Sequence, residues 1–305
     1  MTETKNNKQA APIRRRKWLV ARRWCFFIMI VFAILFCVIW CNTHCGPFCR
    51  TLAWILFGIW LFTIVQVIYC KFFPPIITPL MVQRYIQQRK KSGSKPRFEW
   101  KYVPIDKISP VMVDAADVAE NIGVYMYGRG FLFKALRRAY LLNRTSSTLC
   151  GGSTISQQTA KNCFLPHSRT LFRKVLEAYY VMLIELFWGK KHIMECYLNI
   201  IEYGSGIYGC EAASQHYFHH SAASLTEDEA VMLAASLSWP LRANPDNHTP
   251  YYDHYIESVR SHLHRHEPIN WNVRYEDMDM QKLEEGNQGL LFFVKWWCLQ
   301  QIRKK

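Results

Sequence analysis

The sequence predicts a mostly α-helical domain that follows one or two membrane-spanning segments, and three observations carry this prediction. Two uncharged apolar runs, at 24–41 and 52–70, each approach the roughly 20 residues that cross a bilayer. From 111 to about 264, apolar residues recur at three- and four-residue spacing between short polar breaks, as in packed helices. The stretch "SLTEDEAVMLAASL" opens with a Thr226–Glu229 capping box, and the Trp239–Pro240 pair ends that helix. The fold class is therefore all-α.

The chain divides into five segments by composition. We expect a basic cytoplasmic tail at 1–23, one or two transmembrane segments at 24–70, and a basic, proline-containing linker at 71–97. A folded domain follows at 98–265, and a C-terminal tail at 266–305 carries a short amphipathic apolar segment. The domain begins with an extended lead-in, "FEWKYVPIDKISP".

Most of the formal net charge of +15 lies beside the apolar runs. Residues 1–23 and residues 71–101 each hold eight basic residues against a single glutamate, so the rest of the chain is nearly neutral. Basic flanks of apolar runs are what membrane topology and anionic headgroups favour. Nucleic-acid binding is the poorer explanation, because the folded domain has no basic face for a phosphate backbone.

The eleven cysteines do not indicate a disulfide framework, because their number is odd and they gather in or beside the apolar runs. Cys37, Cys41, Cys45 and Cys49 recur every four residues with His44 among them. A metal site there is an alternative to packing within the membrane, and we favour packing.

The segment "RTLFRKVLEAYYVMLIELFW" (169–188) predicts a helix with one charged stripe. Arg169, Arg173, Glu177 and Glu185 fall along this stripe, and apolar residues cover the other faces. We expect those faces to be buried, which requires the charges to line a cavity or to bear a desolvation cost. The alternative is an ordinary Arg–Glu ladder on a helix surface.

The stretch "GGSTISQQTAKN" precedes this helix and concentrates hydrogen-bonding side chains. Hydroxyls, amides and a lysine beside two arginines suit a sugar pyrophosphate, since neutral groups bind sugars and cations bind phosphates. A polar helix cap and loop is the alternative reading. The candidate ligands are Ser153, Thr154, Gln157, Gln158 and Lys161.

Four motifs in order, "ISPVMVDAADVAEN", "GGSTISQQTAKN", "RTLFRKVLEA" and "KKHIMECYLNIIEYGSGIYGCEAASQHYF", resemble peptidoglycan glycosyltransferases of family 51. The likeness is closest to the monofunctional biosynthetic transglycosylases and covers roughly residues 70–265. It implies a lysozyme-like glycosyltransferase domain that polymerises lipid II into glycan strands by inverting transfer, with release of undecaprenyl pyrophosphate. The implied partners are lipid II, the growing glycan strand, the membrane and proteins of a cell-wall synthesis complex.

The resemblance also implies roles for single residues. Glu120 corresponds to the general base, and Glu177 to a second essential carboxylate that orients the cations or helps to hold a metal. Lys161, Arg169 and Arg173 correspond to the cationic cradle for the pyrophosphate. Ser153, Thr154, Gln157, Gln158 and Asn162 would bind the sugars and brace the cleft. No metal ligands are assigned, and a divalent ion (Mg²⁺ or Mn²⁺) on the donor pyrophosphate is left open.

One motif departs from the family pattern. The family reads Glu-Asp, two residues, Phe, two residues, His, one residue, Gly, whereas this chain has "ENIGVYMYGRG". Asn121, Val124 and Tyr127 replace Asp, Phe and His, and one residue is inserted. The change keeps open a degenerate, non-catalytic member that acts as a cell-wall scaffold. A glycan-cleaving lysozyme-like hydrolase is a further alternative, although it would need neither the cations nor the membrane anchor.

The location follows from the apolar runs and the resemblance together. Basic flanks on both sides predict a hairpin with both ends in the cytoplasm. Lipid II polymerisation, in contrast, takes place outside the cytoplasmic (inner) membrane. We expect one true span and a catalytic domain on the outer (periplasmic) face.

Overall fold

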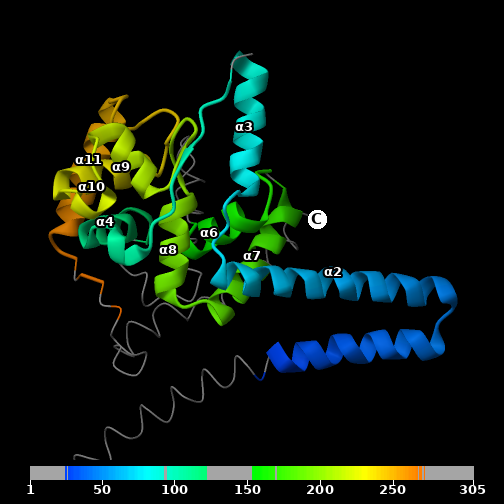
Figure 1. Ribbon diagram of the computed structural model, residues 1–305. Coiled ribbons are helices and arrows are strands. Elements are labelled where there is room, and N and C mark those ends of the chain that lie inside the picture. The colour runs from blue at the N-terminus through cyan, green and yellow to red at the C-terminus, as the bar shows by residue number, and fades with distance from the viewer. Residues whose placement is uncertain are drawn as a thin grey trace, which may run out of the picture. The chain divides into compact units, whose positions relative to one another are not determined.

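The computed structural model describes residues 25, 27–92, 95–121, 153–168, 170–266, 268–269 and 271. It separates into two compact units, with the division of the described chain between Phe73 and Pro74. The basic tail, most of the C-terminal tail, Arg169 and the altered segment after Asn121 lie outside the described residues. Figure 1 shows the helices and strands of both units.

The first unit contains two apolar helices, at Phe27–His44 and at α2 (Pro47–Phe72). At 1.5 Å per residue, the 26 residues of α2 extend about 39 Å, which exceeds the hydrocarbon thickness of a bilayer. Most of their large apolar side chains are exposed and few are buried, so these helices lack the buried surface of core helices in a water-soluble domain. Both fit membrane anchoring, and the prediction of a single span stays a prediction.

The cysteine ladder in this unit does not form a metal site. Among the described residues, no group of three or more His, Cys, Asp or Glu side chains is placed to hold a metal. The His44 ring instead stacks on Trp40 with centroids 4.0 Å apart, and its Nδ1 lies 2.6 Å from the Thr43 hydroxyl.

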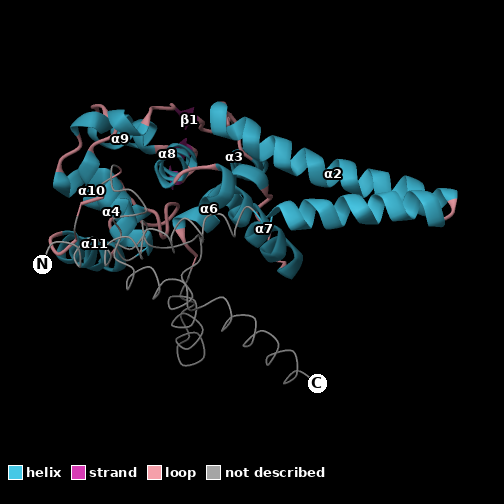
Figure 2. Ribbon diagram, turned by 90° about the horizontal axis from the view of Figure 1, so that it is seen from below, coloured by secondary structure: helices cyan, strands magenta, loops and turns pink. Residues whose placement is uncertain are grey.

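The second unit is a helical domain with one small sheet, so the all-α prediction is confirmed (Figure 2). Its described helices and short 3₁₀ turns, in chain order, are α3 (Pro79–Ser92), η1 (Ile105–Lys107), α4 (Pro110–Asn121), α6 (Ile155–Phe164), α7 (Leu171–Phe187), α8 (Lys190–Ile200), α9 (Cys210–Phe218), η2 (Ala222–Ser224), α10 (Glu227–Ser236) and α11 (Pro250–Leu263). In both views α8 lies between α6 and α7 on one side and α9 and α10 on the other.

Two packing groups build the core of this domain. Helix α4 packs against α10 and α11, and α6 packs against α7 and α8. The largest fully buried aliphatic side chains are Met81, Met112, Ile155, Ile184, Ile193, Met194 and Leu198. The predicted capping box is confirmed: the Thr226 hydroxyl accepts from the Glu229 N–H, and the Glu229 carboxylate accepts from the Thr226 N–H at 2.8 Å.

The lead-in joins a three-stranded sheet. Strand β1 (Glu99–Trp100) pairs in parallel with β3 (Ile207–Tyr208), which pairs antiparallel with β2 (Glu202–Gly204). The extended lead-in was predicted, whereas β2 and β3 were not, because strands of two or three residues give no period-2 signal.

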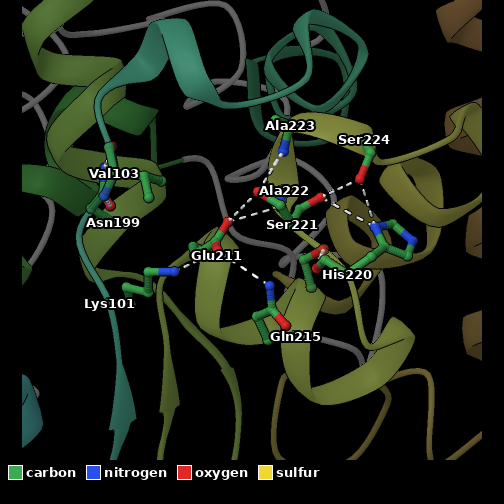
Figure 3. A network of polar contacts seen from close by, with 11 residues as sticks. Lys101, Val103, Asn199, Glu211, Gln215, His220, Ser221, Ala222, Ala223 and Ser224 are labelled. Carbon is green, nitrogen blue, oxygen red and sulfur yellow. Dashed lines mark hydrogen bonds and ion pairs between the residues drawn. The ribbon is translucent and has the colours of Figure 1, made fainter.

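A network of polar contacts fixes the lead-in on the helices behind it (Figure 3). The Asn199 amide on α8 donates to the Val103 carbonyl and accepts from the Val103 N–H, each at 2.8 Å. The buried Glu211 on α9 accepts from Lys101 at 3.0 Å and from the Ala222 N–H at 2.8 Å. Burial alone would raise the pKa of Glu211, but these donors outweigh it and hold the pKa below its usual value.

The turn between β2 and β3 requires glycine at 206. Gly206 has φ of +77°, and an added Cβ would lie 2.2 Å from the carbonyl oxygen of Arg97. We expect Gly206→Ala to lower the free energy of unfolding by at least about 1–3 kcal/mol, the usual cost of a strained backbone conformation. Thermal unfolding of the full chain measures this loss. Gly189→Ser is the matched control, because a Cβ there meets nothing within 4 Å and serine is a favoured N-cap. Equal stability of the two variants would contradict the argument.

Candidate active site

Glu120 lies on the last turn of α4, where its carboxylate meets α6. The Gln158 side-chain amide, on α6, donates a hydrogen bond to Glu120 Oε2. Burial raises the pKa of Glu120 to about 7, against the lowering effects of this hydrogen bond and of the Lys161 charge. A carboxylate at a helix C-terminus also opposes the helix dipole, which acts in the same direction as burial. Glu120 therefore exchanges its proton near neutral pH, as a general base requires.

Three tyrosines lie close enough to Glu120 to interact with its charge. Tyr197 and Tyr203 are fully buried, and the Tyr255 hydroxyl donates to the Ala119 carbonyl at 2.8 Å. Burial raises the pKa of all three phenols, that of Tyr255 to about 12, and the nearby charge of Glu120 acts in the same direction on each of them. The neutral tyrosines form an environment of low polarity, which accounts for the raised pKa of Glu120.

A second carboxylate, Glu177 on α7, is held by two cations. Its side chain is 2% exposed, and Arg173 Nη1 lies 2.5 Å from its Oε2. Lys174 pairs with the other carboxylate oxygen. Each oxygen of Glu177 thus has its own cation from the preceding turn of the helix, which compensates for the burial of the charge.

The charges of both carboxylates affect the pKa of Lys161 on α6. Burial lowers the pKa of its ammonium group, and the charges of Arg173 and Lys174 act in the same direction. Glu177 and Glu120 oppose that shift. Because Gln158 and Lys161 are three residues apart, α6 presents the partner of Glu120 and a cation on one face.

The rest of the polar stretch begins and braces α6. The Thr154 hydroxyl accepts from the Gln157 N–H, and the Gln157 side-chain oxygen accepts from the Thr154 N–H at 2.9 Å. Thr154 and Gln157 thus have these atoms in a capping box rather than open to a sugar. Ser153 is exposed at the start of the segment. Asn162 is 1% exposed, and neither of its side-chain polar atoms has a hydrogen-bond partner among the described residues.

The structure corrects two expectations about α7. Glu185 does not join the cationic cluster, because it accepts from Ser156 at 2.6 Å and from Lys190 at 2.7 Å. The apolar faces of the helix are not all buried: Leu171, Phe172, Val175 and Met182 are 56–72% exposed. Periodicity shows which residues share a face but not what covers that face.

One residue of the cluster was missed and one cannot be placed. Lys174 was not predicted, although its spacing of three residues from Glu177 was a readable signal. Arg169 lies outside the described residues. The described part of the chain thus brings together Glu120, Gln158, Lys161 and an ion-paired group on α7. This α7 trio consists of Arg173, Lys174 and Glu177.

Comparison with known proteins identifies the family. The family model described as transglycosylase matches residues 87–264, which is more than half of the chain. The chain belongs to the transglycosylase family. It is 50% identical over 179 residues to the biosynthetic peptidoglycan transglycosylase of Caulobacter vibrioides, covering 59% of this chain and 75% of that protein. Proteins of the same name from Bacteroides thetaiotaomicron (42% over 189 residues; 62% and 75% covered) and Xylella fastidiosa (38% over 205 residues; 67% and 84%) are also similar.

Family membership gives the described charges a common context. The matched region begins within α3 and ends one residue after α11, so it contains Glu120, Lys161 and the α7 trio. The transglycosylase fold therefore holds the raised-pKa carboxylate and the cations in one domain. The roles of the individual residues remain proposals.

The raised pKa of Glu120 makes a prediction about stability. Its folded-state pKa of about 7 exceeds the roughly 4.3 of an unfolded glutamate, so the folded protein binds the proton more tightly between these values. The free energy of unfolding contributed by this group therefore falls as pH rises from about 4 to about 7, and it is constant above that. We expect Glu120→Gln to match wild type at about pH 4, to become increasingly more stable than wild type up to about pH 7, and to keep a constant advantage at higher pH. Melting temperatures across pH measure this difference. A difference independent of pH would contradict it, and Glu257→Gln, at an exposed glutamate, is the control.

Proposed function

We propose that the protein is a peptidoglycan glycosyltransferase that polymerises lipid II into glycan strands with release of undecaprenyl pyrophosphate. The observation that carries the proposal is the arrangement around α6. On one side of α6, the Glu120 carboxylate of α4 has a pKa near 7. On the other side, Lys161 of α6 interacts with the buried Glu177 of α7, which pairs with two further cations. A base for a hydroxyl and a cradle for a diphosphate are the two parts that this transfer needs.

In the proposed reaction, the 4-hydroxyl oxygen of the acceptor sugar attacks the anomeric carbon of the donor. Glu120 takes the hydroxyl proton as the new glycosidic bond forms. The bond from the anomeric carbon to the pyrophosphate oxygen breaks on the opposite face, so the configuration inverts. The negative charge that develops on the leaving group is stabilised by Lys161 and Arg173, with Arg169 as a further proposed member.

Glu177 has an organising role in this scheme. In the resting site it fixes Arg173 and Lys174 through both carboxylate oxygens. A diphosphate would share these cations without requiring them to be repositioned, and such preorganisation is where electrostatic catalysis gains most. Ser153 is the exposed residue of the polar stretch and the one we propose for sugar binding. The buried Asn162 side chain braces the interior of the site instead.

The described residues do not fit a protein-held divalent metal. Both oxygens of Glu177 already pair with cations, and no cluster of three suitable ligands is present in the described part of the chain. The Mg²⁺ or Mn²⁺ ion considered from the sequence has no place of its own among these side chains. The scheme above therefore includes no metal-dependent step.

The membrane location and the binding partners of the protein are also proposals. The two apolar helices fit anchoring in a membrane, and we propose the cytoplasmic (inner) membrane with the domain on its outer (periplasmic) face. Lipid II and the growing strand are the proposed substrates, and cell-wall synthesis proteins the proposed partners. Neither alternative function gains support: the altered segment lies outside the described residues, and a hydrolase has no use for the α7 cations.

The deciding experiment incubates the purified full-length protein with labelled lipid II and separates the products by size. We expect polymer from wild type and a decrease of about 10²–10⁴-fold in rate for Glu120→Gln, the usual contribution of a general base. Glu257→Gln should polymerise as wild type does. Absence of polymer from folded wild type would overturn the proposed function and favour the scaffold alternative.

A second prediction tests the cradle through the residue that the sequence reasoning missed. Lys174→Gln removes one charge-assisted contact to a diphosphate, so we expect KM for lipid II to rise roughly tenfold with a smaller effect on kcat. Lys107→Gln, at an exposed lysine of η1, controls for the loss of a positive charge. Equal KM values for the two variants would remove Lys174 from the cradle.

A further inference from the structure

Two adjacent glutamines on α6 have different surroundings. The Gln157 side chain points back to the helix start, where its oxygen accepts from the Thr154 N–H. The Gln158 side chain points to the end of α4 and donates to Glu120 Oε2. Successive residues on a helix are about 100° apart, so only one of the two can face α4. The family resemblance implies sugar binding or bracing of the cleft for both.

The contact between Gln158 and Glu120 joins α6 to α4, and the two residues are 38 positions apart in the sequence. Glu120 is one residue from the end of α4, and the residues that follow Asn121 are outside the described part of the chain. Among the described residues, Gln158 is the one side chain that donates a hydrogen bond to this carboxylate. The tyrosines near Glu120 supply bulk and low polarity instead: the Tyr255 hydroxyl donates to the Ala119 carbonyl, and neither Tyr197 nor Tyr203 donates to Glu120 among the described residues.

We propose that Gln158 is the positioning residue of the Glu120 carboxylate, and that it acts on the base rather than on a sugar. This inference rests on the proposed function, because it assigns Glu120 as the base. The amide N–H of Gln158 fixes one carboxylate oxygen and so directs the other toward the acceptor hydroxyl.

The chemistry of an amide suits both states of the base. A carboxylate accepts only, and the amide nitrogen donates to it. After proton transfer, the carboxylic acid has an O–H, which the amide oxygen can accept by rotation of the side chain. A carboxylate at 158 could not donate, and an apolar side chain could do neither. Glutamine therefore keeps a hydrogen bond to Glu120 before and after the proton moves.

The electrostatics support the same assignment. Burial raises the pKa of Glu120, and the hydrogen bond from Gln158 is the first of the effects that lower it. Without this donor the ionised form loses its main local stabilisation, so the base is active over a narrower range of pH.

The test measures polymerisation of lipid II by the full-length protein between pH 5.5 and 9, comparing wild type with Gln158→Met, which keeps side-chain length and loses the donor. We expect the acidic limb of the kcat profile to move upward by about one pH unit, which is roughly a tenfold loss of kcat at pH 6. KM for lipid II should stay within about threefold of wild type, because no sugar contact is removed. An unmoved acidic limb with a raised KM would overturn the proposal and make Gln158 a sugar ligand.

Two further variants separate positioning from structure. Gln158→Glu is nearly isosteric and places a like charge beside Glu120, so the acidic limb should move further upward than in Gln158→Met. Gln215→Met is the matched control, because Gln215 also donates to a glutamate, Glu211, at 3.3 Å on α9. Its acidic limb should coincide with that of wild type. A shift as large as that of Gln158→Met would show a general effect on the fold and would overturn the proposal.

A readout without turnover separates this inference from the proposed function. The carboxyl pKa of Glu120 is followed by NMR in protein labelled with ¹³C at glutamate Cδ, with Glu120→Gln assigning the signal. An upward shift in Gln158→Met supports the pairing even if wild type makes no polymer, in which case the proposed function alone fails. An unchanged pKa overturns the positioning role whatever the activity.

Discussion

The site of the catalytic domain depends on buried ionisable groups that lie on both sides of the short helix α6. Glu177 is 2% exposed, and Glu120 and Lys161 have pKa values displaced by burial toward their neutral forms. Such groups stay in a folded protein only where partners compensate for lost hydration. Helix α6 supplies part of that compensation on each side, with Gln158 toward α4 and Lys161 toward α7. Its capping box and its packing on α7 and α8 therefore control the site as well as the fold.

Much of the fold could be predicted because its signals are local. The helical period, the capping box of α10 and the extended lead-in all depend on neighbouring residues. The pairing of Arg173 with Glu177 also follows from a spacing of four. The predicted stripe failed at Glu185, since eight residues span more than two turns and Ser156 and Lys190 reach it from other elements. Lys174 was missed although a spacing of three is as local as one of four.

The different contacts of Gln157 and Gln158 show a further limit of prediction from the sequence. The pattern Thr154-x-x-Gln157 is a readable capping signature, and recognising it would have removed these two side chains from the sugar ligands. That Gln158 then meets Glu120 could not be predicted, because the two residues are 38 positions apart and their contact depends on the packing of α4 beside α6. A sequence motif indicates which residues belong to a site, whereas the packing of the helices determines which of those residues are in contact.

Helix α7 buries charged residues on one side and exposes apolar residues on the other, and the proposed substrate gives this a reason. At 100° per residue, Leu171, Val175 and Met182 lie within about 40° of one another, while Arg173 and Glu177 lie on the opposite side. The side that carries the charges is buried together with apolar residues such as Tyr180 and Ile184, whereas the side of Leu171, Val175 and Met182 is exposed. In water this arrangement forgoes the burial of large side chains, at about 25 cal/mol per Å² of apolar surface. A donor that carries both a diphosphate and a long hydrocarbon chain needs cations and apolar surface close together, and α7 provides them on its two sides.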